Sequence, residues 1–386
     1  MKKYIVYVLF AIVAALLEGC EEVANMQDVI LFTGTENTSK VNFTVEQPTE
    51  MGVTVTATEK VTRDTKISLA IGTQEHLNAY NVKEGKQYQF PPKGSYKLEA
   101  DETIIKEGNY VSEAVKLSIL SLEQFKDGVT YCIPLVITDT DGDMPVLESS
   151  RVMHVVINRV LIQRALKLGG HCGLHVPQFM TDPRVSALGQ ITMETRVRVD
   201  AFHRADWGIA SIMGIEETYL LRFCDIDVKQ NQLQMGPALI NGNEKNFITS
   251  ESNYEVGKWY HIASVFDGSS VAIYVNGKLD VKFSLNPGTV NLNEDYFDGF
   301  WIGQSCGSRY LDGTLCETRV WSRALTASEL QEKMCVVDPK SEGLLAYWRM
   351  NEVQDDGRIL DVTGNGFDAY PKNSSYSFVD NVKCPF

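Results

Sequence analysis

The sequence predicts an all-β chain of two domains behind a short export signal. Short runs in which polar and apolar residues alternate, such as residues 41–45 and 52–58, recur along the chain with turn-forming residues between them. Asn276 and Gly277 also join two alternating runs, and this pair strongly indicates a hairpin because a type I′ turn needs positive φ at both central positions. The chain has 386 residues, which is enough for two domains of ordinary size.

The first residues have the layout of a secretory signal. Lys2 and Lys3 precede an apolar run over residues 4–17, which is shorter than the ~20 apolar residues of a membrane-spanning helix. Cys20 stands at the expected cleavage point, and this arrangement resembles the lipobox of bacterial lipoproteins, in which the cysteine is acylated. We therefore expect removal of residues 1–19 and lipidation of Cys20; an ordinary signal peptide with an incidental cysteine is the alternative.

Residues 20–27 are predicted to be a tether. Glu21 and Glu22, directly behind the cysteine, resemble the signal that places Bacteroidetes lipoproteins on the outer face of the outer membrane. The expected location is therefore the outer membrane, with a lipid anchor and the protein facing the extracellular side. The net charge of −14 disfavours nucleic acid and anionic lipid headgroups as partners and is compatible with neutral sugars or divalent cations.

The chain has eight cysteines, and once Cys20 is assigned to lipid an odd number remains, so at least one is expected to be free. None lies at a spacing typical of metal ligands. Export permits disulfides, and Cys335 with Cys384 is the pair that we single out for one. The alternative is a purely structural role, in which the cysteines are small, buried apolar residues on strands.

The first domain is predicted over residues 28–160 as a β-sandwich, because short strands follow one another at about 8–12-residue spacing. One of these strands, residues 131–137, contains Pro134, which indicates a bulge or an edge position because proline cannot donate to a ladder. The strings AYN (79–81), FPPKGSY (90–96) and YCIPL (131–135) resemble a recurring N-terminal domain of Bacteroidetes surface lipoproteins. The resemblance implies an Ig-like sandwich of unassigned function that precedes a glycan-directed module, and we expect it to act as a spacer.

The second domain is predicted over residues 165–386. Residues 258–283 are expected to form a three-stranded antiparallel meander around the Asn276-Gly277 turn. A helix is expected from Ala327 to Met334, because Thr326 and Glu329 form a capping box at its start.

Several strings of this domain resemble the laminin-G-like jelly roll of the concanavalin A-like superfamily. They are WYHIA (259–263), IYVNGK (273–278), FWIG (300–303), ETRVWSRAL (317–325) and GLLAYWRM (343–350). The resemblance implies two curved antiparallel sheets and the binding of glycans or proteins, often with calcium.

The sequence lacks the usual signs of catalysis. Glucanases of this superfamily carry a Glu-x-Asp-x-x-Glu run on one strand, which this chain does not have. Asp225 and Asp227 have no glutamate partner, and Glu194 and Asp200 are too far apart to cooperate on one strand. We therefore expect no enzymatic activity, and a hydrolase with an unfamiliar carboxylate pair is a less favoured alternative.

A sugar site needs an aromatic face for the C–H surface of the ring and polar side chains for its hydroxyls. Trp207 lies in a polar, loop-like stretch, and the ring of Trp301 should face away from its apolar neighbours on a strand. Two tyrosines and an arginine lie in nearby polar segments; the alternative for each residue is a partly buried loop anchor. The predicted ligand-binding residues are Trp207, Trp301, Tyr296, Tyr310 and Arg309.

A calcium ion is a further expectation, because calcium takes 6–8 oxygen ligands and the glycine-bent loop 361–368 is rich in carboxylates and amides. The predicted ligands are Asp361, Asn365, Asp368 and Glu352. A turn in which these side chains bond their own backbone is an equal alternative.

These observations favour a surface lipoprotein whose jelly roll binds extracellular glycan and serves polysaccharide capture or uptake, with other uptake components as partners. A protein-binding adhesion module is the first alternative. The step from architecture to uptake is an analogy with similar proteins.

Overall fold

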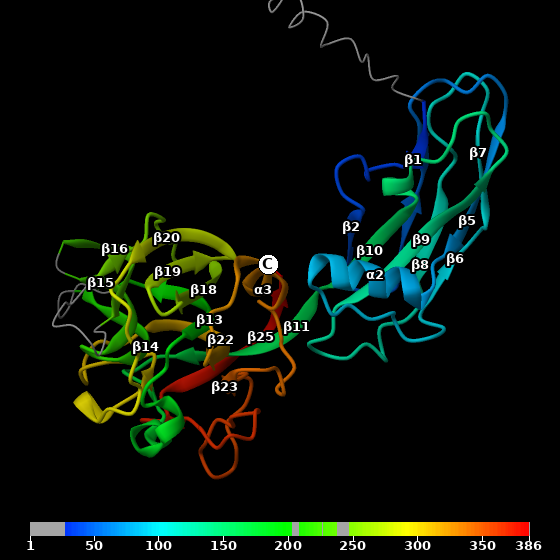
Figure 1. Ribbon diagram of the computed structural model, residues 1–386. Helices are drawn as coiled ribbons and strands as arrows, with labels where there is room; N and C mark the ends of the chain where they lie inside the picture. The colour runs from blue at the N-terminus through cyan, green and yellow to red at the C-terminus, as the bar shows by residue number, and fades with distance from the viewer. Residues whose placement is uncertain (1–27, 203–207, 226, 238–246, 386) are drawn as a thin grey trace, which may run out of the picture. The chain divides into compact units, whose positions relative to one another are not determined.

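The computed structural model describes residues 28–202, 208–225, 227–237 and 247–385 (Figure 1). Their regular secondary structure is mainly strand, and the predicted all-β fold class is confirmed. Contacts divide the chain into two compact units, of which the first comprises residues up to Gln124 with Thr130–Asn158, and the second Phe125–Val129 with Arg159–Phe386. None of the helices in the described ranges is long and apolar enough to cross a membrane.

The first unit contains three sheets of described strands. The five-stranded sheet has the order β2 (Lys40–Val45), β10 (Val152–Arg159), β9 (Tyr131–Thr140), β5 (Thr65–Ile71) and β7 (Glu102–Ile105). The smaller sheets are β3 (Thr49–Val53), β8 (Val115–Ile119) and β6 (Tyr96–Leu98), and β1 (Ile30–Phe32) with β4 (Val55–Ala57).

Pro134 lies in the central strand β9, between β10 and β5, so the expected edge position is wrong. The register pairs Pro134 with His154, whose backbone N–H donates away from β9 to the carbonyl of Ser39 over 2.6 Å. The carbonyl of Pro134 accepts from the N–H of Gly72 over 2.8 Å, just beyond the end of β5. The missing N–H of the proline therefore points to a place where the ladder has already ended.

Helix α2 (Gln74–Glu84) is a feature of this unit that the sequence patterns did not indicate. At its start, the ring nitrogen Nδ1 of His76 accepts from the backbone N–H of Thr73 over 3.0 Å, and at its end Gly85 has φ 63°. Only Leu77 and Tyr80 of the helix are buried, so it lacks the broad apolar stripe by which a surface helix is recognised.

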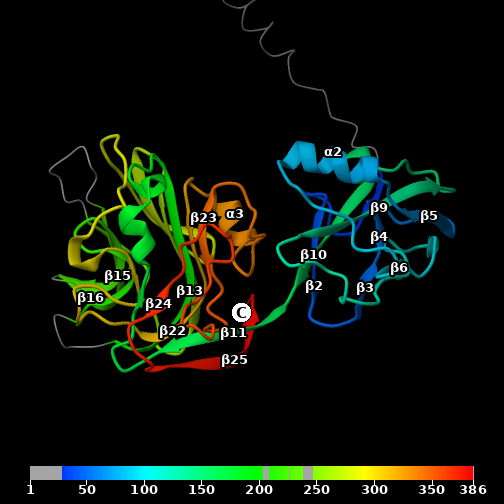
Figure 2. The same ribbon diagram turned by 90° about the horizontal axis from the view of Figure 1, so that it is seen from below.

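The second unit is built from two larger sheets (Figures 1 and 2). One has the order β20 (Lys278–Ser284), β19 (Ser270–Val275), β18 (Trp259–Phe266), β13 (Ile191–Ala201), β22 (Asp312–Trp321), β11 (Leu161–Leu168) and β25 (Tyr376–Cys384), with β23 (Leu344–Trp348) also paired to β22. The other has the order β17 (Ile248–Thr249), β16 (Val228–Pro237), β15 (Tyr219–Asp225), β14 (Ala210–Ile215), β21 (Trp301–Ile302), β12 (Leu174–His175) and β24 (Tyr370–Pro371). Short 3₁₀ turns are η1 (Glu148–Ser150), in the first unit, and η2 (Pro177–Thr181), η3 (Pro183–Val185) and η5 (Tyr296–Asp298) in the second.

One apolar core joins the two sheets of the second unit, with Ile262 and Phe266 from the first and Leu221 and Phe223 from the second. The predicted meander is confirmed as β18–β19–β20, and its turn has φ 51° at Asn276 and 74° at Gly277. The predicted helix is confirmed as α3 (Ala327–Glu332), two residues shorter than expected, with its capping box in place. It packs against the other face of the eight-stranded sheet.

Beneath α3 this other face carries buried charges. The carboxylate of Glu194 accepts from Trp321 Nε1 and His261 Nε2, each over 2.8 Å, and from Arg319 over 3.0 Å. Burial alone would raise the pKa of Glu194, but Arg319 and His261 outweigh it and lower the pKa to about 2. Glu194 is therefore a buried structural anion.

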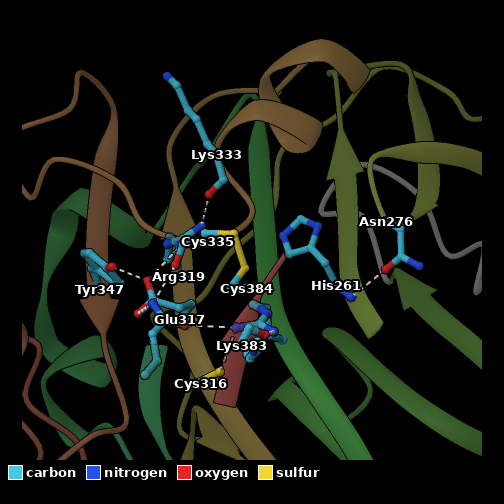
Figure 3. The surroundings of a disulfide bond; sticks show 12 residues. His261, Asn276, Cys316, Glu317, Arg319, Lys333, Cys335, Tyr347, Lys383 and Cys384 are labelled. Atoms are coloured by element: carbon cyan, nitrogen blue, oxygen red, sulfur yellow. Dashed lines mark hydrogen bonds and ion pairs between the residues drawn. A yellow bond between two sulfur atoms is a disulfide. The ribbon is translucent and has the colours of Figure 1, made fainter. Parts of the chain in front are cut away.

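Cys335 and Cys384 form a disulfide, which confirms the predicted pair (Figure 3). Buried polar side chains hold the backbone on both sides of it. Arg319 donates to the carbonyl of Lys333 over 2.9 Å, and Arg196 donates to the carbonyl of Lys383 over 2.8 Å. The disulfide thus ties the end of β25 to the segment that follows α3.

Candidate functional site

The seven-stranded sheet turns polar side chains to the face opposite the core. Along β15, Leu221 and Phe223 belong to the core, so Arg222 between them points the other way. Gln234 on β16 lies between the core residues Leu233 and Met235 and pairs directly with Arg222.

Arg222 is the centre of an ion cluster on this face. Its guanidinium donates to Glu216 Oε1 over 3.0 Å and to Gln234 Oε1 over 2.8 Å, and it also pairs with Asp225. Arg309 donates to the same Glu216 oxygen over 2.6 Å. The cluster therefore combines two guanidinium groups with two carboxylates, and its charges are balanced.

Burial differs across this cluster. The side chains of Glu216 and Arg222 are only 2% and 8% exposed, whereas those of Arg309 and Asp225 are 23% and 19% exposed. Burial would lower the pKa of Arg309, but the Glu216 carboxylate outweighs it and raises the pKa. Arg309 and Asp225 are thus the charged groups that a ligand can reach.

The second carboxylate oxygen of Glu216, Oε2, lies in the interior of the cluster beside the Cys306 thiol. This oxygen is buried and has no nitrogen or oxygen donor among the described residues. Burial and the neighbouring Glu216 carboxylate raise the pKa of the Cys306 thiol to about 11, so this thiol stays protonated at neutral pH.

A loop between β21 and β22 brings Arg309 to the cluster. The hydroxyls of Ser211 and Ser305 lie 2.7 Å apart, and the N–H of Ser211 donates to the carbonyl of Arg309 over 3.3 Å. These bonds fix the loop to the first residues of β14, while Glu216 comes from the turn at the other end of that strand.

Phe247 adds an exposed aromatic ring beside the cluster. The guanidinium of Arg222 lies 5.7 Å from its centroid, and the ring is 46% exposed. Gly236 leaves room for it, because a Cβ at that position would lie 2.7 Å from the ring.

The described residues among the predicted ligand-binding set have different surroundings. Arg309 joins the cluster, whereas Tyr310 stacks on His171 with centroids 4.6 Å apart. Trp301 stacks on His175 with ring centroids 4.6 Å apart and is buried, and Tyr296 is about half exposed. Trp207 lies outside the described residues, as does Cys20.

Sequence patterns missed Glu216, Arg222, Gln234 and Phe247. Arg222 could have been recognised from the sequence, because it is a charged residue within the otherwise apolar strand YLLRFC. Asp225, one of the two neighbouring acids that the sequence offers to a hydrolase, is ion-paired to Arg222.

The predicted calcium ligands have protein partners. The Asp361 carboxylate accepts from the backbone N–H groups of Tyr347, Thr363 and Phe367, each over 3.1 Å. Asp368 accepts from Arg358 over 2.7 Å, and Glu352 is exposed. No group of three or more His, Cys, Asp or Glu residues in the described ranges could hold a metal.

The amide of Asn365 donates to the carbonyl of Leu345 over 2.9 Å, so this residue too bonds backbone within the loop region. Because their oxygens are largely taken by protein donors, the residues fit the turn alternative better than a calcium ion. Calcium binding by this chain stays a prediction.

Comparison with known proteins agrees with the architecture. Residues 177–331 match the family model of the concanavalin A-like lectin/glucanases superfamily, and residues 25–144 match that of an N-terminal domain. No curated protein matches the chain.

Among solved structures, a carbohydrate-binding candidate from Bacteroides ovatus ATCC 8483 is 22% identical with a TM-score of 0.58, and the match covers 91% of this chain and 97% of that one. A second match is to the CBM40 of Ruminococcus gnavus IT-sialidase, with 16% identity and a TM-score of 0.34. This match covers 44% of this chain and 96% of the CBM40. The two family matches show that the chain combines an N-terminal domain, matched over residues 25–144, with a concanavalin A-like domain.

Proposed function

We propose that this chain, an N-terminal domain followed by a concanavalin A-like domain, is a surface lipoprotein that binds an extracellular glycan. The observation that carries the proposal is the cluster of Glu216, Arg222 and Arg309 on the solvent face of the seven-stranded sheet, with the exposed ring of Phe247 beside it.

The chemistry of this face suits a sugar. Arg309 offers donors and Asp225 offers acceptors for hydroxyls, and both side chains are partly exposed. Phe247 offers an apolar surface to the C–H face of a ring. A few polar groups beside an aromatic surface are the usual composition of a small-ligand site.

Binding is favoured over hydrolysis. Glycosidases need one carboxyl group as a proton donor and a second as a nucleophile or base. Both carboxylates of this cluster, Glu216 and Asp225, are ion-paired to Arg222, so neither is set up as a free acid.

The matched Bacteroides ovatus protein supports the same reading, because it shares both domains over nearly its whole length and is a candidate for carbohydrate binding. By analogy, the glycan would be captured for uptake by other components of a polysaccharide-uptake system.

The membrane location is part of the proposal and rests on Cys20 with Glu21 and Glu22. Expression of the full chain in a Bacteroides host fed an alkyne-labelled fatty acid should label the protein, and the Cys20→Ala variant should stay unlabelled. Labelling of both forms would refute the anchor.

A glycan array probed with soluble residues 21–386 tests the binding function. Signals confined to one class of polysaccharide would support it. Silence across the array, together with binding to a protein from the same environment, would favour the adhesion alternative.

A further inference from the structure

The loop before β21 has an unusual backbone. Phe297, Asp298 and Gly299 all have left-handed conformations, with φ of 49°, 63° and 77°. Glycine adopts this region freely, whereas a bulky residue such as phenylalanine is rarely found there and carries a conformational cost.

Neighbouring residues hold this loop in place. The ring of His175 donates from Nε2 to the carbonyl of Asp298 over 2.6 Å. Asn293, at the start of the loop, donates to the carbonyl of Asp182 over 3.0 Å. A Cβ at Gly299 would lie 2.6 Å from the side chain of Met180, so the loop also packs closely on η2.

The strained backbone presents two aromatic rings to solvent. Tyr296 and Phe297 are 48% and 50% exposed, and their rings meet edge to face with centroids 4.6 Å apart. Neither belongs to an apolar core of the described residues. The left-handed conformation of Phe297 costs free energy, and the two exposed rings bury little apolar surface in return. Backbone outliers of this kind cluster at functional sites.

The register of the sheet places this loop at the end of β14 from which Glu216 enters the ion cluster. Trp301 pairs with His175 on one side and with Gly214 on the other, so His175, which holds the loop, lies two strands from β14. Because β14 and β21 are antiparallel, the chain leading into Trp301 reaches the sheet at the end where β14 turns at Glu216. Tyr370, 38% exposed, extends the aromatic row beyond His175.

We propose that Tyr296 and Phe297 form an aromatic subsite for one sugar ring of a glycan whose adjoining part is held at Arg309 and Asp225. This inference rests on the proposed function and specifies its ligand as an oligosaccharide of several units. From Tyr370 on β24 to Gly236 on β16 the sheet spans six strands, or ~24 Å, which is longer than a single sugar.

The charges around the loop specify the ligand further. Glu294, Asp295 and Asp298 flank the aromatic pair, and the whole chain has a net charge of −14. Like charges repel acidic sugars such as uronic acids, so the subsite is suited to neutral units.

Calorimetric titration of soluble residues 21–386 with linear di- to hexasaccharides of glucose, mannose, xylose and arabinose tests the subsite. Affinity should rise about tenfold from the short to the long members of the binding series, as expected for one added aromatic contact. Phe297→Gly suits the left-handed backbone and removes only the ring, so it should lower affinity for the long members and leave that for the short ones unchanged. Tyr110→Ala, at an exposed tyrosine of the first unit, is the matched control.

Equal affinity for short and long members, or no effect of Phe297→Gly alone and with Tyr296→Ala, would overturn the subsite while glycan binding itself stands. Absence of binding to the whole panel and to the glycan array would instead overturn the proposed function, and the subsite with it.

Discussion

Arg309 donates a hydrogen bond to Glu216 over 2.6 Å across 93 residues of sequence, and Arg222 donates to the same oxygen. The Glu216 carboxylate therefore binds the guanidinium groups of Arg222 and Arg309, which come from different parts of the jelly roll. Glu216 is itself buried, whereas the outer sides of Arg309 and Asp225 are open to a ligand, which is why we place the site here.

Removal of Arg222 should destabilise the second unit. Arg222→Ala leaves Glu216 and Asp225 without their partner, and loss of one member of a buried ion pair costs about 3–5 kcal/mol of unfolding free energy. Arg164→Ala, which removes an exposed pair with Asp380, should cost about 0–1 kcal/mol. Urea unfolding followed by circular dichroism measures both, and equal costs would refute the central position of Arg222.

Loss of the disulfide should lower the unfolding free energy by about 2–4 kcal/mol, because the bond closes a loop between residues 49 apart. Thermal unfolding of the wild type with and without dithiothreitol measures this. The Cys335→Ser, Cys384→Ser double variant should already unfold at the lower temperature and show no further response to the reductant. A response of the double variant equal to that of the wild type would contradict the assignment.

The first unit should lose stability as the pH falls from about 6.5 towards 4. Burial lowers the pKa of His154 from 6.5 to about 4, so in this window the unfolded chain binds a proton that the folded chain does not. Above pH 6.5 the contribution is fully present. Unfolding of the wild type and of His154→Gln at pH 7 and pH 5 tests this, since the variant should lose part of the pH dependence; an unchanged dependence would exclude His154 as its source.

Calcium removal should leave the melting temperature unchanged, because Asp361 and Asp368 already accept hydrogen bonds from the protein. Thermal unfolding in calcium and in chelator checks this expectation. If calcium raised the melting temperature of the wild type but not that of Asp361→Asn, the result would instead support a calcium site at this loop.

Local chemistry made part of this structure predictable. The Asn276-Gly277 turn and the Thr326–Glu329 cap depend on neighbours a few residues away, and both are confirmed. Pro134 was misplaced because its tolerance depends on where β5 ends, at a partner strand more than sixty residues earlier. Sequence alone does not contain that pairing.

The site was less predictable for the same reason. The polar surroundings of Arg309 in the sequence predict an exposed ligand contact, but its partner Glu216 lies in a distant turn and its neighbour Arg222 within an apolar strand. Only the register of β14, β15 and β16 brings them together. Among the aromatic residues predicted to bind ligand, the structure exposes Tyr296 and buries Trp301, and their role in binding stays a prediction.

The most direct test of the account is the affinity of Arg309→Ala for the glycan that binds the wild-type protein on the array. Removal of a hydrogen-bonding charge from the site should weaken binding by at least about tenfold. Arg222 still pairs with Glu216 in this variant, so its circular dichroism spectrum should remain that of a folded protein. Arg63→Ala, at an exposed arginine of the first unit, should bind as the wild type does. Unchanged affinity of Arg309→Ala would show that the glycan binds elsewhere and would contradict the site assigned here.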